Sequence, residues 1–133
     1  MAEPHLPAKA TVLMVEDDPH LLQLVSWHLR GFGYHVVEAC SAAEAVQILS
    51  EGGTFDLLFT DVVLPDEPNG IELARRARQA LGAGLKVLLT SGYLNEELMN
   101  HYGSPDEDAL LLPKPYTRDE LAAALRTVLG SRA

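Results

Sequence analysis

The chain has 133 residues, enough for one domain that buries an apolar core without help from metals or disulfides. Its 10 basic and 19 acidic residues give a net charge of −9, which opposes binding to nucleic acid or to anionic membranes and suits a protein that holds a cation. A single cysteine, Cys40, excludes an internal disulfide and favours a reducing, cytoplasmic location; we expect its side chain to be buried.

The sequence shows no membrane or export signal. It contains neither an apolar stretch of 18 residues nor a basic segment followed by an apolar one. Residues 1–10 carry two prolines in a polar setting and are expected to form a flexible tail. The domain is therefore expected to span residues 11–130.

The first third of the chain predicts two strands, each followed by a helix. Residues 11–15 form an apolar run that stops at Glu16-Asp17-Asp18, which predicts a core strand ending in acid. Apolar residues at helical spacing over 19–32 predict an amphipathic helix. A modest strand over 34–39 and a helix opened by the capping-box spacing of residues 41–44 follow.

The central stretch, residues 55–65, predicts a buried strand that carries a carboxylate. The run is short, rich in Phe and Leu, and bounded by Gly52-Gly53 and Pro65, which favours a strand over a helix. Asp61 then stands at the carboxyl end of this strand. We expect its position to be fixed and its carboxylate to be accessible.

The second half repeats the alternation. Residues 71–81 predict a helix, 85–90 a strand that ends in Thr90-Ser91, and 94–102 a weak helix. Residues 109–112 predict a last short strand before Lys114, and a capping box at 117–120 opens a helix to residue 129. The pattern gives five strands and five helices in strict alternation.

Strict alternation predicts a doubly wound α/β sheet with parallel strands and helices on both faces. Ligands of such sheets bind beyond the carboxyl ends of the strands. Polar side chains follow four of the predicted strands at these ends: Glu16, Asp17, Asp61, Thr90, Ser91 and Lys114. Four coinciding strand ends indicate a functional site.

The residue types at this edge indicate phosphoryl chemistry. Three carboxylates brought together repel one another, and a bound cation or raised pKa values relieve the repulsion. Oxygen ligands favour a hard divalent ion, Mg²⁺ before Ca²⁺. A metal, a hydroxyl and a lysine together bind phosphoryl oxygens, and Asp61 can act as the nucleophile. The sequence thus predicts an aspartyl-phosphate site.

Four motifs carry a resemblance to a known family. They are Val15-Glu16-Asp17-Asp18-Pro19, Thr60-Asp61-Val62-Val63-Leu64-Pro65, Leu89-Thr90-Ser91-Gly92 and Lys114-Pro115-Tyr116. In this order and spacing, residues 10–130 resemble the receiver domain of two-component response regulators. The resemblance implies a flavodoxin-like five-stranded parallel sheet of order 2-1-3-4-5 with five helices.

The resemblance also implies a role for each matching residue. Asp61 resembles the phosphoacceptor, and the implied metal ligands for Mg²⁺, with Mn²⁺ possible, are Asp17, Asp61, Glu16 through water and the backbone carbonyl of Val63. The implied phosphoryl-binding and switch residues are Thr90, Ser91 and Lys114. The bond before Pro115 is expected to be cis.

The chain departs from the family pattern in two places. The loop from Asp61 to Gly70 is one residue longer than in the simplest members, a form that resembles receivers of hybrid histidine kinases. Leu111 stands at the switch position where many members have an aromatic residue.

Val63 and Gly92 occupy the positions two residues after the phosphoacceptor and two residues after the switch hydroxyl, where members of the family commonly have side chains that position water. Neither residue has a polar side chain, which predicts slow loss of phosphate.

The implied function is a signalling switch. The resemblance implies that a histidine kinase or a histidine phosphotransfer protein donates the phosphoryl group to Asp61 in a Mg²⁺-dependent reaction. The domain is not expected to be an enzyme beyond assisting its own phosphorylation and dephosphorylation. No output domain, nucleic acid or membrane partner is expected.

Leu22 is expected to be exposed on the first helix, where it would pack on the donor.

Three other classes of protein are alternatives to a receiver domain. A phosphohydrolase of the haloacid dehalogenase type needs a second acid two residues after the nucleophile, where this chain has Val63. A flavodoxin-like electron carrier needs a hydroxyl- and glycine-rich phosphate loop where this chain has Glu16-Asp17-Asp18. A pseudo-receiver that binds partners without phosphorylation stays open, although all the expected site positions are filled.

Overall fold

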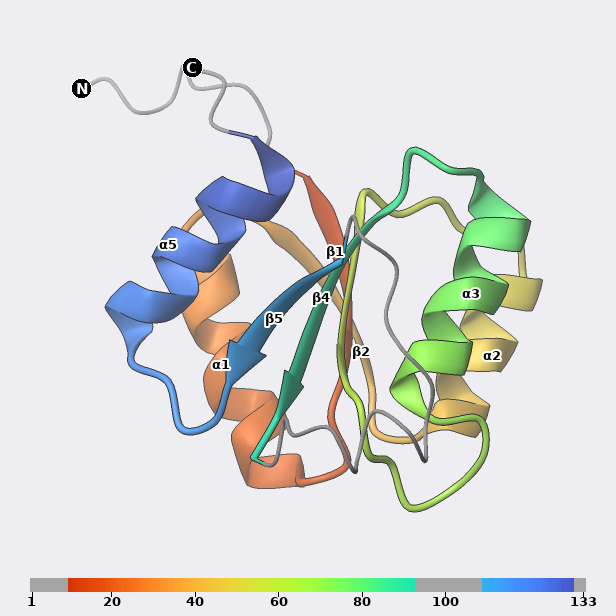
Figure 1. Ribbon diagram of the computed structural model, residues 1–133, viewed down its shortest axis with the longest axis horizontal. Coiled ribbons are helices and arrows are strands. Elements are labelled where there is room, and N and C mark those ends of the chain that lie inside the picture. Colours follow the sequence, from red (N-terminus) through yellow and green to blue (C-terminus); the bar gives the residue numbers. More distant parts are fainter. Residues whose placement is uncertain (1–9, 93–108, 131–133) are drawn as a thin grey trace.

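The fold is built on one five-stranded parallel sheet. The computed structural model describes residues 10–92 and 109–130. The strands follow the order β2-β1-β3-β4-β5, with all neighbours parallel (Figure 1). Their bounds are β1 Thr11–Val15, β2 His35–Ala39, β3 Leu57–Asp61, β4 Lys86–Ser91 and β5 Leu110–Pro113. The predicted parallel sheet and its strand order are confirmed.

Helices cover both faces of the sheet, as the doubly wound prediction required. They are α1 Pro19–Gly31, α2 Ala42–Ser50, α3 Gly70–Leu81 and α5 Arg118–Leu129. In Figure 1, α1 and α5 lie on one side of the strands, and α2 and α3 lie on the other. No helix in residues 10–92 or 109–130 has the length and apolar character needed to cross a membrane.

Each helix begins at a side chain that accepts hydrogen bonds from its first turn. The caps are Asp18 for α1, Ser41 for α2, Asn69 for α3 and Thr117 for α5. Such caps pair backbone N–H groups that a helix leaves free. The capping box predicted for α5 is present, with Glu120 bonded back to the Thr117 N–H. In α2 the corresponding acidic side chain, that of Glu44, accepts instead from Cys40 N at 2.8 Å.

The core consists of two apolar layers, one on each face of the sheet. One layer packs β1, β3 and β4 against α2 and α3, and the other packs the alternate residues of these strands against α1 and α5. All five residues of β3 are buried. A strand that is buried on both faces reads as a continuous apolar run, which is why residues 57–59 showed no alternation. The sheet therefore holds Asp61 rigidly from both sides.

Two of the expected segments lie outside the described residues. The structure describes four helices, and the fifth one expected, over residues 94–102, falls within the undescribed segment. The same holds for residues 1–9 of the expected tail. In the described part, β3 begins at Leu57 rather than at Phe55. Asp56 exchanges bonds of 2.9 Å with the backbone of Thr11, through its own N–H and its side chain.

The expectations for Leu22 and Cys40 were wrong. Leu22 is 7% exposed, because it lies on the inward stripe of α1 with Val25 and Leu29. The outward side chains of this helix include Leu24, 51% exposed, and Trp27, 70% exposed. Cys40 is exposed, since it directly follows the last residue of β2 in the turn that leads to α2.

This correction predicts a large difference between two leucines of α1. We expect Leu22→Ala to lower the free energy of unfolding by about 2–5 kcal/mol, because it opens a cavity in the core. The matched variant Leu24→Ala, on the same helix, should change it by less than about 0.5 kcal/mol. Urea unfolding followed by circular dichroism measures both values. Equal effects of the two substitutions would contradict the burial of Leu22.

Candidate functional site

The candidate site lies at the edge of the sheet where the strands end. Asp61 is the last residue of β3 and is paired in register with Thr90 of β4. Glu16 directly follows β1 and Lys114 directly follows β5. Because the strands are parallel, these four side chains reach one edge, as the sequence predicted.

Backbone hydrogen bonds continue across this edge beyond the strands. Glu16 N donates to Ala39 O at 3.1 Å, which joins the ends of β1 and β2. Val62 N donates to Thr90 O at 2.9 Å. Lys114 N donates to the carbonyl of the last β4 residue at 3.0 Å. The loops that carry the site are therefore held to each other by the sheet, and the positions of the side chains are well defined.

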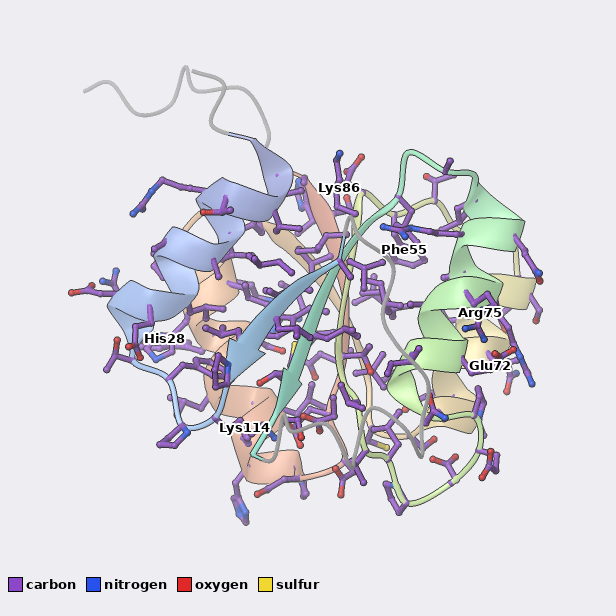
Figure 2. The ribbon with its side chains drawn as sticks, viewed as in Figure 1. His28, Phe55, Glu72, Arg75, Lys86 and Lys114 are labelled. Carbon is purple, nitrogen blue, oxygen red and sulfur yellow. The ribbon has the colours of Figure 1, made fainter. Side chains whose placement is uncertain are left out.

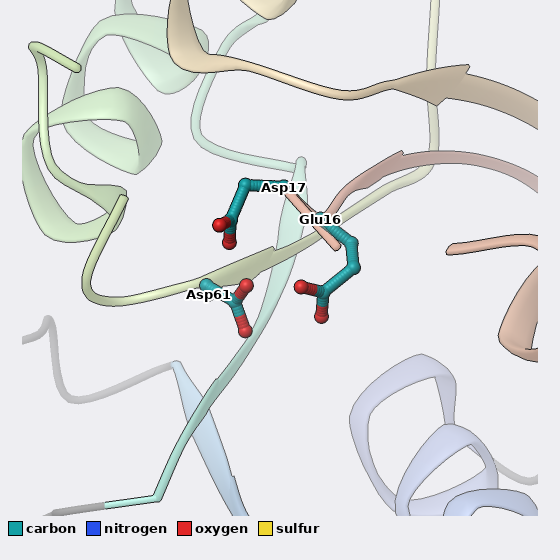
Figure 3. Close-up of side chains that lie close together, drawn as sticks. All are labelled: Glu16, Asp17 and Asp61. Atoms are coloured by element: carbon teal, nitrogen blue, oxygen red, sulfur yellow. The ribbon is translucent and has the colours of Figure 1, made fainter. Parts of the chain in front are cut away.

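Three carboxylates converge at this edge. Glu16, Asp17 and Asp61 each offer an oxygen, and these oxygens lie within 4.8 Å of one another (Figure 3). Glu16 and Asp61 are 1% and 4% exposed, and Asp17 is exposed. The expectation that the Asp61 carboxylate would be accessible was wrong, because Lys114 and Glu16 pack against it.

Lys114 is the cation that faces these acids. Its Nζ donates to Glu16 Oε1 at 3.0 Å and forms an ion pair with Asp61 Oδ1 at 2.9 Å. Figure 2 shows Lys114 at the end of the strands opposite to Lys86, the first residue of β4. The peptide bond between Lys114 and Pro115 is cis, which agrees with the expectation from the resemblance.

One ammonium compensates only part of this negative charge. Burial raises the pKa of Asp61 to about 7; the interaction with Lys114 opposes this rise and the nearby Glu16 adds to it. Burial lowers the pKa of Lys114, but its contacts with Asp61 and Glu16 outweigh burial and raise the pKa overall. At neutral pH the site therefore holds an ammonium and an Asp61 that is poised to lose or keep its proton.

The three acidic residues after β1, Glu16, Asp17 and Asp18, have different contacts. The side chain of Glu16 also accepts from Asp18 N, 3.1 Å from Oε2. Asp18 caps α1 by accepting from His20 N at 3.0 Å and Leu21 N at 3.3 Å. Asp17 points toward Asp61 (Figure 3). The sequence signal for the cap was the proline directly after Asp18, since proline favours the first turn of a helix.

The remaining predicted residues lie on β4, on β5 and in the loop after Asp61. Thr90 is fully buried, and its hydroxyl has no hydrogen-bond partner among the residues that the structure describes. Ser91 is buried and lies at the end of β4. Val63 is 41% exposed, in the loop after Asp61. Leu111, on β5, is 37% exposed, so the switch position presents an aliphatic side chain to the surface.

Sequence reasoning missed the role of Gly70. A Cβ at this position would lie 1.9 Å from the carbonyl oxygen of Asp61, a distance that no side chain tolerates. Gly70 N donates to Val62 O at 2.8 Å. The start of α3 is therefore pressed against the backbone of the candidate phosphoacceptor. The signal in the sequence was Asn69-Gly70, which directly precedes the helix predicted over residues 71–81.

Tyr116 belongs to one of the four sequence motifs, but sequence reasoning assigned it no role. Its hydroxyl is buried without a hydrogen-bond partner among the described residues, and its ring lies 6.3 Å from that of Phe59. Burial raises the pKa of Tyr116 well above its usual value, and the charges of Glu16 and Asp61 add to this effect. The buried phenol therefore lies within the electrostatic field of the acids.

The acidic cluster fits a hard divalent cation. Three carboxylates from two strand ends provide oxygen ligands only, which suits Mg²⁺ or Mn²⁺. Asp17 is open to water, so solvent can complete the coordination of a small ion. Burial is the main cause of the raised pKa of Asp61 and Glu16 adds to it, and a cation bound beside these carboxylates would lower that pKa.

The chain belongs to the response regulator receiver domain family. The family pattern matches residues 12–126, which is most of the chain and includes every residue of the candidate site. Its relatives include bacterial two-component proteins. The sensor kinase CckA of Brucella abortus (strain 2308) is 34% identical over 125 residues, which cover 93% of this chain and 13% of that protein.

Solved structures share the fold. The receiver domain of the hybrid histidine kinase CckA is 33% identical with a TM-score of 0.72, and the alignment covers 90% of this chain and 98% of that one. The receiver domain of the sensor histidine kinase PA1611 of Pseudomonas aeruginosa PAO1 is 24% identical with a TM-score of 0.78, over 93% and 100% of the two chains. That structure contains a magnesium ion coordinated in its active-site cleft.

The similarity covers only part of the curated relatives. The chain spans 13% of sensor kinase CckA and 48% of the transcriptional regulatory protein CpxR of Escherichia coli (strain K12), to which it is 32% identical over 119 residues, 89% of this chain. The shared part is the receiver domain.

The raised pKa of Asp61 predicts how stability depends on pH in metal-free protein. Between pH 4 and 7 the folded state keeps a proton that the unfolded state has released, so the free energy of unfolding should fall as the pH rises through this window. In Asp61→Asn this fall should be much smaller. At pH 8 that variant should be more stable than wild type by about 2–4 kcal/mol.

Urea unfolding in a chelator at several pH values measures this difference. Glu67→Gln is the control, because it removes one negative charge from an exposed position in the loop after β3. The same pH dependence in wild type and Asp61→Asn would contradict a raised pKa.

Proposed function

We propose that this receiver domain is a phosphorylation switch that accepts a phosphoryl group on Asp61 from a phosphohistidine donor. The observation that carries the proposal is the convergence of Asp61 with two further carboxylates and with Lys114. This arrangement supports cation binding and phosphoryl binding next to the same nucleophile.

In the proposed reaction, a carboxylate oxygen of Asp61 attacks the phosphorus of the donor. The phosphorus–nitrogen bond breaks, an acyl phosphate forms, and the leaving imidazole takes up a proton from solvent. Lys114 turns from the Asp61 oxygen to a phosphoryl oxygen, and its charge offsets the charge that the phosphoryl group brings. The buried Thr90 hydroxyl, unpaired within the described residues, is suited to bind another phosphoryl oxygen.

We assign the cation site to Asp17, Asp61, Glu16 acting through water and the backbone carbonyl of Val63. Mg²⁺, when bound, supplies charge neutralisation on the phosphoryl oxygens; Mn²⁺ is the alternative ion. The fit of the acidic cluster and the magnesium ion described for the PA1611 receiver support this assignment. Lys114 contacts two members of the cluster directly, Asp61 and Glu16.

We further propose that the donor is a histidine kinase or a histidine phosphotransfer protein, in line with the kinase relatives. The domain assists only its own phosphorylation and dephosphorylation. In this respect it is a signalling module rather than an enzyme.

Phosphorylation with acetyl phosphate and Mg²⁺ tests the proposal. On a phosphate-affinity gel we expect a shifted band for wild type and none for Asp61→Asn, because the nucleophile is gone. With Mg²⁺ present, Asp17→Ala should be labelled no more than wild type is labelled in chelator. The reason is that this variant loses a proposed ligand of the ion.

The matched control for these variants is Asp56→Asn. It alters a carboxylate of the same segment at the opposite end of β3, where its side chain accepts from Thr11 N. Its labelling should equal that of wild type. Labelling of Asp61→Asn, or full labelling of Asp17→Ala in chelator, would refute the proposed site.

The persistence of the phosphoryl group is expected to depend on Val63 and Gly92. Hydrolysis of the acyl phosphate needs a water molecule held in line with the phosphorus. Val63 and Gly92 have no side-chain group that forms a hydrogen bond. A Cβ at Gly92 would meet nothing within 4 Å among the described residues, so this position admits a side chain at its Cβ. We therefore expect slow intrinsic dephosphorylation.

Val63→Asn combined with Gly92→Glu should speed the loss of phosphate by about tenfold or more, or roughly 1.4 kcal/mol of barrier. The decay of phosphorylated protein on the affinity gel, after removal of acetyl phosphate, measures the rate. Gly84→Glu is the control for added charge, because a Cβ at that distant glycine also meets nothing within 4 Å. A double variant that is phosphorylated normally but decays at the wild-type rate would contradict the prediction.

A further inference from the structure

The loop after the phosphoacceptor is fastened to a helix distant in sequence. Asp66 Oδ1 accepts from Ala42 N at 3.0 Å, and its Oδ2 accepts from Ala43 N at 2.9 Å. These N–H groups belong to the first turn of α2 and have no partner within the helix. Figure 1 shows the loop between β3 and α3 beside the start of α2. One carboxylate thus joins two segments that are 24 residues apart.

The contact with Asp66 completes the N-terminus of α2. Ser41 Oγ accepts from Glu44 N at 3.1 Å, and the carboxylate of Glu44 accepts from Cys40 N. Asp66 pairs the two remaining N–H groups of this turn. Hydrogen bonds from Ala43 and Ala42 lower the pKa of Asp66, and burial opposes this only in part. Its carboxylate is therefore charged at neutral pH, which the positive end of the helix dipole also favours.

The other two contacts that hold this loop are made by Val62 and Gly70, next to Asp61. Val62 is bonded through its N–H to β4 and through its carbonyl to Gly70 N. Gly70 is in turn pressed against the Asp61 carbonyl. The loop therefore begins and ends at the phosphoacceptor, and Asp66 fixes its far side. Val63 lies between these attachments.

We propose that Asp66 is a positioning residue that couples the N-terminus of α2 to the cation site. By holding the loop against α2, Asp66 orients the backbone of Val63, whose carbonyl is an assigned cation ligand. This inference rests on the cation site of the proposed function. Coupling between two sites is reciprocal, so a cation at the site must also tighten the contact between Asp66 and α2 by the same factor.

The test measures both directions of the coupling. Calorimetric titration with Mg²⁺ should show about 5- to 10-fold weaker binding to Asp66→Ala than to wild type, within the usual range of such coupling. Hydrogen exchange at the Ala42 and Ala43 amides should be faster in that variant. In wild type, Mg²⁺ should slow exchange at these two amides, and in Asp66→Ala it should have no such effect.

Two further variants separate positioning from charge and folding. Glu67→Gln removes the same charge from the next residue, which is exposed, and should leave Mg²⁺ affinity within about twofold and α2 exchange unchanged. Asp66→Asn keeps an acceptor oxygen suited to a helix cap and should give intermediate values of both quantities. It also keeps the test open if Asp66→Ala fails to fold.

The outcomes are distinguishable. Equal Mg²⁺ affinity in wild type and the Asp66 variants would overturn the positioning role and leave the proposed function intact. An equal loss of affinity in Glu67→Gln would also overturn it, since charge alone would then explain the effect. Absence of Mg²⁺ binding to wild type would refute the cation site and the coupling together, even if the α2 amides exchange faster in Asp66→Ala.

Discussion

The burial of two carboxylates beside one ammonium is the constraint on which this domain depends. Glu16 and Asp61 are almost fully buried, and Lys114 contacts both. Taking charges out of water is costly unless opposite charge is close, and one lysine does not balance the cluster with Asp17. The fold therefore stores an unbalanced charge at the carboxyl ends of its strands. A divalent cation is the species that would offset this negative charge.

The backbone keeps these charges together. Strand pairing fixes Asp61 opposite Thr90, and bonds beyond the strands join the loops that carry the acids and the lysine. Acidic side chains near the site also hold the backbone, by capping helices. Asp18 caps one helix and Asp66 completes the cap of another, so not every acid at this edge faces the cation site. Of the residues in the acidic run, only Glu16 and Asp17 join Asp61.

Family membership and local geometry answer different questions. The match over residues 12–126 establishes a receiver domain, and the same domain occurs in a sensor kinase and in a transcriptional regulator, both much longer than this chain. The local geometry of this chain shows the aliphatic Leu111, the nonpolar residues Val63 and Gly92 and the loop bound to α2 through Asp66. Under the proposed function, Val63 and Gly92 bear on the lifetime of the phosphoryl group, and the loop bears on the coupling of the site to α2.

The sequence alone predicted the alternation of strands and helices and the residues of the acidic site, because apolar runs that end in polar residues are local signals. The strand order was implied only by the resemblance of the four motifs to receiver domains. Tertiary structure decided what depends on distant contacts. Leu22 is buried because of how α1 is rotated against the sheet, which its periodicity did not resolve. The pairing of Asp66 with α2 and the contact of Gly70 with Asp61 arise only when segments apart in sequence meet. The same packing covers the Asp61 carboxylate and sets its pKa, since desolvation depends on every neighbour that surrounds it.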